Sequence, residues 1–96
     1  MRQGDQVIVR AFGERPIKAH FWEDSGEGAL VVSARAYKAF EQQGEAPSAV
    51  GLDKRDIFIF EESVYHDLKV AFERGETKHL QMFWDRAQRV KATVSR

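Results

Sequence analysis

The chain has 96 residues and a mass of 11.0 kDa, which is the size of one small domain. Lys and Arg total 15 and Asp and Glu total 15, so the formal net charge is +0, which argues against a dedicated, strongly basic nucleic-acid clamp. The absence of cysteine excludes disulfides, thiol catalysis and cysteine-ligated metal centres.

The N-terminal residues give no sign of a targeting segment. The first six are polar, and the apolar run that follows stops at Arg10, far short of a signal-peptide core. No apolar stretch approaches the roughly 20 residues that a membrane-spanning helix needs. We therefore expect a cytoplasmic protein that has no contact with a membrane.

The first third of the chain predicts three strands. Side chains alternate with a period of two over residues 7–12 and 17–23, and a third strand is predicted over 29–34. Residues 13–16 and 24–28 are rich in turn-forming types, so they are expected to connect the strands tightly. Two short turns between three successive strands predict an antiparallel meander.

The middle of the chain predicts a short helix, a loop and one more strand. Apolar residues fall at helical spacing over 35–43, and Gly44 is expected to close that helix. Residues 44–56 are interpreted as a loop, long enough to be a possible functional loop. β-Branched and aromatic residues then predict a strand over 57–60.

The C-terminal segment 63–91 is predicted to be helical. Ser63 is the expected N-cap, Gly75 the expected end of a first helix, and Thr77 the expected cap of a second. A single helix that continues through Gly75 is the alternative, because an internal glycine costs only about 1 kcal/mol relative to alanine. Such a helix would be about 40 Å long and would overhang the domain, where it would pair with another subunit.

These elements predict an α+β fold. It consists of a three-stranded antiparallel meander, a short helix and a fourth strand, forming a curved sheet or a small SH3-like barrel, followed by one or two C-terminal helices. We expect one domain over 1–96, with a β-rich part at 5–61 and a helical part at 63–91.

The first two strands have one apolar face and one mixed face. The apolar face, expected to form the core, consists of Val7, Val9, Ala11, Ile17, Ala19 and Phe21. The mixed face consists of Ile8, Arg10, Phe12, Lys18, His20 and Trp22.

Two arrangements of the mixed face compete. If it is open, its rings stack on nucleic-acid bases and its cations meet phosphates. If helices cover it, the rings belong to a core and the charged groups extend to the rim. The strand at 57–60 is apolar on both faces, which favours the covered arrangement because such sheets are normally covered on both sides.

The helical segment has an apolar surface that is large for a domain of this size. An apolar stripe wider than one sheet face can cover predicts a surface for self-association or for another protein. The predicted interface residues are Tyr65, Phe72, Leu80, Phe83 and Trp84. The alternative is that two helices simply pack on each other and on the sheet.

The chain shows no constellation of catalytic or metal-binding residues. Its three histidines are His20, His66 and His79, and Glu62 with His66 is a two-ligand pair that lacks a third ligand at a recognisable spacing. No serine has the nucleophile-elbow context, and the glycines do not form a phosphate-binding loop. We therefore expect no catalytic residue, no metal site and no cofactor.

Three functions follow in order of preference. The first is a non-catalytic interaction module that acts through protein contacts, either with itself as a homodimer through the helical segment or with another protein. The second is a nucleic-acid-binding module that uses the mixed face, with Arg10, Lys18, His20 and Trp22 meeting the ligand. The third is a small metal-dependent or acid–base hydrolase built on the histidines and nearby carboxylates.

Overall fold

The structure, a computed structural model, describes residues 1–90 and contains one five-stranded antiparallel sheet with three helices. The strands are β1 (Gln6–Ala11), β2 (Arg15–Asp24), β3 (Gly28–Ser33), β4 (Val50–Asp53) and β5 (Ile57–Ile59). Their order across the sheet is β4-β3-β2-β1-β5, and the sheet curves into a half-barrel. The predicted α+β fold with a curved sheet is confirmed.

The predicted meander is formed by β1, β2 and β3. Val9 pairs with Ile17 across the first hairpin, and Phe21 pairs with Val31 across the second. The first connection is a 3-10 turn, η1 (Phe12–Glu14). Alternation and turn chemistry are local signals, so they placed these hairpins correctly.

A fifth strand lies inside the segment that was predicted to be a loop, so that prediction is wrong for residues 50–53. β4 pairs with β3 at the edge of the sheet. A Cβ atom at Gly28 would meet the backbone oxygen of Leu52, so the missing side chain lets the two strands approach. Because β4 is short and contains Gly51, it shows no clear alternation, and its partner strand stabilises it.

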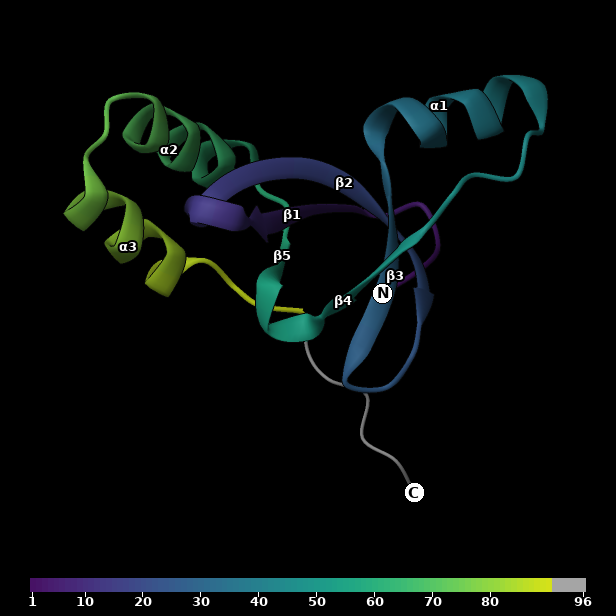
Figure 1. Cartoon of the computed structure of the whole chain (residues 1–96), viewed down its shortest axis with the longest axis horizontal. Helices are drawn as coiled ribbons and strands as arrows, with labels where there is room; N and C mark the ends of the chain where they lie inside the picture. The colour runs from purple at the N-terminus through teal and green to yellow at the C-terminus, as the bar shows by residue number, and fades with distance from the viewer. Residues whose placement is uncertain (91–96) are drawn as a thin grey trace.

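The helices are α1 (Ala34–Gln43), α2 (Glu62–Glu73) and α3 (Thr77–Arg86). Gly44 ends α1 in the left-handed region, as expected, and its N–H donates to Phe40 O at 2.8 Å. Gly75, at φ +69°, separates α2 from α3, so the C-terminal segment forms two helices and not one. Figure 1 shows α2 and α3 together near one end of the curved sheet and α1 near the other end.

Two predicted helix starts are off by one or two residues. Ser63 lies inside the first turn of α2, where Glu61 is the N-cap, and Thr77 is the first residue of α3, where Glu76 is the N-cap. Neither N-cap forms a side-chain capping bond, so packing and not a cap sets these starts.

The chain leaves α3 at Arg86, earlier than predicted. Ala87 is extended, Ile59 N donates to Gln88 O at 2.7 Å, and Val90 N donates to Ile57 O at 2.9 Å. Residues 87–90 therefore cover the free edge of β5, which satisfies backbone groups that a bare edge strand would leave open. Lys91, the last residue of the predicted helical segment, lies outside the described residues.

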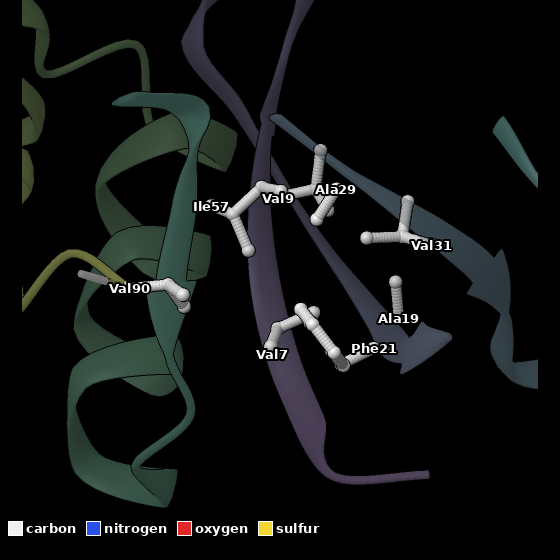
Figure 2. Close-up of a cluster of buried hydrophobic side chains, with 8 residues drawn as sticks. All are labelled: Val7, Val9, Ala19, Phe21, Ala29, Val31, Ile57 and Val90. Atoms are coloured by element: carbon white, nitrogen blue, oxygen red, sulfur yellow. The ribbon is translucent and has the colours of Figure 1, made fainter. Parts of the chain in front are cut away.

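One core lies on one face of the sheet. Figure 2 shows its side chains converging from four strands and from the segment after α3. They are Val7, Val9, Ala19, Phe21, Ala29, Val31, Ile57 and Val90. Two residues of the predicted apolar face do not belong to this cluster: Ile17 is exposed, and Ala11, at the end of β1, is only half-buried.

A second core lies between the other face of the sheet and the pair α2–α3. It consists of Ile8, Phe58, Leu68, Ala71, Leu80, Trp84 and Ala87. The sheet is thus covered on both faces, as the two apolar sides of β5 favoured. None of the helices within residues 1–90 combines the length and apolar character needed to cross a membrane.

Candidate functional site

The charged side chains of the mixed face lie against aromatic rings next to α2 and α3. The guanidinium carbon of Arg10 is 5.6 Å from the centre of the Trp84 ring, and its Nε donates to Asp56 Oδ1 at 3.1 Å. Lys18 Nζ lies 4.9 Å from the centre of the Tyr65 ring. Both cations are thus engaged within the chain through cation–π and ionic contacts.

α1 covers the opposite end of the mixed face. The His20 ring stacks on Tyr37 with centroids 4.2 Å apart, and its Nδ1 lies 2.8 Å from Gly4 O. Trp22 meets Phe40 edge-to-face at 5.0 Å. These rings pack against helix side chains, so they do not form an open row of platforms on which bases could stack.

Phe12 is the exception, because its side chain is fully exposed at the tip of the first hairpin. The next two residues, Gly13 and Glu14, have φ of +74° and +64°, which turns the chain sharply and points the ring outward. Trp84 Nε1 donates to Glu14 O at 2.9 Å. The hairpin that presents Phe12 is therefore fixed to α3 by a hydrogen bond from a buried side chain.

The predicted interface residues divide into buried and accessible ones. Trp84 is 2% exposed and Leu80 is 5% exposed, so both belong to the second core and offer little surface on the outer side of the helices. They are core residues because the sheet lies directly beneath the stripe that carries them. Phe72 is 36% exposed, and Tyr65 and Phe83 are half-buried, so these three remain accessible.

A small pocket opens between the hairpin tip and the turn that joins α2 to α3. Its volume is about 150 Å³. The lining residues are Gly13 and Glu14 from the hairpin, Ala71 and Phe72 from α2, Gly75 from the turn, and Thr77 and Leu80 from α3. Phe12 precedes Gly13 in the chain, so an exposed aromatic ring and a largely apolar pocket share one surface.

A larger groove of about 330 Å³ lies between α2 and α3. Val70, Met82 and Phe83 line it together with His66 and His79, and Met82 is 37% exposed. The structure thus brings two of the three histidines to one groove. Within residues 1–90, however, no three His, Asp or Glu side chains gather closely enough to hold a metal ion.

A polar crevice of about 300 Å³ lies beside the 3-10 turn η2 (Lys54–Asp56). The backbone N–H of Arg55 donates to the Asp53 carboxylate at 2.8 Å, and the Arg55 guanidinium donates to it at 3.3 Å. These two contacts, the backbone N–H most strongly, hold the pKa of the Asp53 carboxyl below its ordinary value. Lys54 is buried, and its Nζ lies 2.6 Å from Asp24 Oδ2. These contacts fasten the turn to the sheet, and no local pattern predicts the burial of Lys54.

The pocket beside Phe12 is the feature that sequence reasoning missed. The signals present were Gly13 and Gly75, which predicted turns but not an empty space between them. Turn glycines carry no side chain to fill such a space, and only the packing of α2 on the sheet places the two turns side by side. No protein-family model, curated protein or solved structure matches this chain.

Proposed function

We propose that this chain is a non-catalytic interaction module that acts through protein contacts and self-associates through the α2–α3 segment. The observation that carries the proposal is the set of large apolar side chains left exposed on and beside these two helices. Phe72 and Met82 are more than one-third exposed, and Phe12 on the adjoining hairpin is fully exposed.

An exposed aromatic residue on a rigid element is the type of group on which protein interfaces depend most. Aromatic residues and methionine are enriched at interface centres, where burial of one ring removes about 150–250 Å² of apolar surface from water. Both helices pack on the sheet through the second core, so the outward side chains are held on a firm support. The backbone beneath this surface therefore loses little conformational entropy on binding.

The contacts of the mixed face give less support to nucleic-acid binding. Arg10 already pairs with Asp56, and Lys18 lies over the Tyr65 ring. Phosphate binding would have to compete with these contacts. The hydrolase hypothesis is also less well supported, because His79 is a surface side chain whose Nδ1 lies 3.7 Å from Glu76 Oε1. That distance exceeds the reach of a hydrogen bond between a catalytic base and its partner.

The test is the molar mass in solution, measured by light scattering on a size-exclusion column over a range of protein concentrations at low and high salt. We expect the mass to rise with concentration from 11.0 kDa toward twice that value, and to change little with salt. Apolar contacts are not screened, whereas binding to phosphates weakens steeply as salt is added.

A matched pair of variants locates the interface. The double variant Phe72→Ser, Met82→Ser removes exposed apolar groups from α2 and α3, and we expect it to weaken self-association. Val50→Ser removes an exposed apolar group from β4, outside the helical segment, and should leave self-association unchanged. A wild-type chain that remains monomeric at every concentration would overturn the proposal.

A further inference from the structure

We infer that two copies of this chain associate by mutual insertion of Phe12 into the pocket between the first hairpin and the α2–α3 turn of the other copy. This inference rests on the proposed self-association and specifies its contacts. It starts from the adjacency of a fully exposed ring and a small, largely apolar pocket.

The size of the pocket matches the group that would fill it. Its volume is about 150 Å³, and an apolar cavity of about 150 Å³ is large enough to bind benzene. The Phe12 ring is a phenyl group and therefore has the size of benzene. The side chains of Ala71, Phe72 and Leu80 would surround the ring with apolar atoms.

Mutual insertion requires that the ring and the pocket belong to the same patch. In a two-fold dimer the same patch of each chain faces its own copy, so a residue and the site that it contacts on the partner must both lie in that patch. Phe12 directly precedes Gly13, which lines the pocket, and so meets this condition. The ring cannot fill its own pocket, because the turn at Gly13 and Glu14 points it outward.

The hairpin is held in the conformation that this contact needs. Glu14 adopts φ +64°, which is unfavourable for a residue with a side chain, and the bond from Trp84 Nε1 to Glu14 O stabilises that conformation. Phe12 is thus presented on a rigid support, which lowers the entropic cost of binding.

The area available indicates a weak, concentration-dependent dimer. Two rings bury about 300–500 Å². The pocket walls contribute a comparable area, which brings the total to about 600–1,000 Å², below the roughly 1,200 Å² of a standard stable interface. The surrounding charges permit this approach: Glu14 and Arg15 on the hairpin, and Arg74, Glu76 and Lys78 at the turn, supply both signs on each surface.

The test uses two variants that remove opposite halves of the contact. Phe12→Ser removes the ring and leaves the pocket. Thr77→Trp places a large side chain at an exposed position of the pocket wall and leaves the ring. We expect either substitution to raise the dimer Kd by at least about thirtyfold, the effect of losing an interface hot spot. Val50→Ser should not change the Kd.

Mixing the two variants provides a second readout. Neither variant can form the contact with itself, but the intact Phe12 of Thr77→Trp fits the intact pocket of Phe12→Ser. We expect an equimolar mixture, followed by sedimentation equilibrium from about 10 µM to 1 mM, to associate more strongly than either variant alone. The association in the mixture should remain weaker than that of wild type, because only one of the two insertions is restored. Circular dichroism of each variant verifies that it is folded.

The outcomes separate the inference from the function on which it rests. A wild-type dimer that Phe12→Ser leaves intact and Phe72→Ser, Met82→Ser disrupts would overturn the insertion and keep self-association through α2–α3. A mixture that associates no better than its components would also overturn the insertion. A wild-type monomer at all concentrations would overturn both.

Discussion

Replacing Trp84 with phenylalanine tests how the first hairpin is fastened to the helices. The change removes the hydrogen bond from Nε1 to Glu14 O, at a cost of about 1 kcal/mol. The smaller ring also leaves about 40 Å³ empty beside Phe58, whose ring centre lies 4.8 Å from that of Trp84. At about 24 cal/mol per Å³ this void costs about 1 kcal/mol, and the lost apolar contact adds up to about 1 kcal/mol more.

We therefore expect Trp84→Phe to lower the free energy of unfolding by about 2–3 kcal/mol, out of about 5–15 kcal/mol for a domain of this size. The assay is urea unfolding followed by far-ultraviolet circular dichroism, whose signal comes mainly from the backbone and not from the altered tryptophan. With an m-value of about 1 kcal/mol per M, the midpoint should fall by about 2–3 M.

The chain provides a matched control in its other tryptophan. Trp22 is half-buried and meets Phe40 edge-on, so Trp22→Phe should cost less than about 1 kcal/mol. Equal losses at the two positions, or a loss below about 0.5 kcal/mol for Trp84→Phe, would refute the assigned role of the hydrogen bond and of the tight packing.

Three further substitutions have defined outcomes in the same unfolding assay. Glu14→Gly should stabilise the chain by up to about 1 kcal/mol, because glycine adopts φ +64° without strain and keeps the acceptor oxygen; destabilisation would contradict this. Gly4→Ala should destabilise it by about 1–3 kcal/mol, because φ is +96° and the added Cβ would collide with Tyr37; a shift in midpoint near zero would show that Tyr37 moves aside freely. The Asp53 carboxyl has a lowered pKa in the folded chain, so its charge stabilises the fold above about pH 4 and this contribution is lost as the pH falls through the lowered pKa. Asp53→Asn should therefore lower the midpoint at pH 7, and the difference from wild type should shrink as the pH falls below about 4, whereas a loss that does not change with pH would point to a cause other than charge.

Much of the fold could be predicted because its signals are local. The period-two alternation of β1 and β2 is a property of neighbouring residues, as are the glycines at positions 44 and 75 that end α1 and α2. The apolar character of both sides of β5 also indicated correctly that the sheet has two covered faces.

The candidate site could be predicted only in part. Alternation placed Phe12, Arg10 and Trp22 on one face, and the structure agrees that Arg10 and Trp22 lie under helices. The sequence could not show that Phe12 is the one residue of this face left fully exposed, because exposure at the hairpin tip depends on how α2 and α3 pack on the sheet. The helical stripe likewise showed that Trp84 and Phe72 are apolar, but not that one is buried in the sheet contact and the other exposed.

Local preferences are enough to explain the antiparallel hairpins, the helical segments and their glycine ends, since each depends on residues close together in the chain. Three features have no such local cause: residues 50–53 form an edge strand, residues 87–90 cover β5, and the turns at Gly13 and Gly75 line one pocket. These features depend on contacts between segments distant in sequence, and burial and backbone pairing at such contacts override local preference.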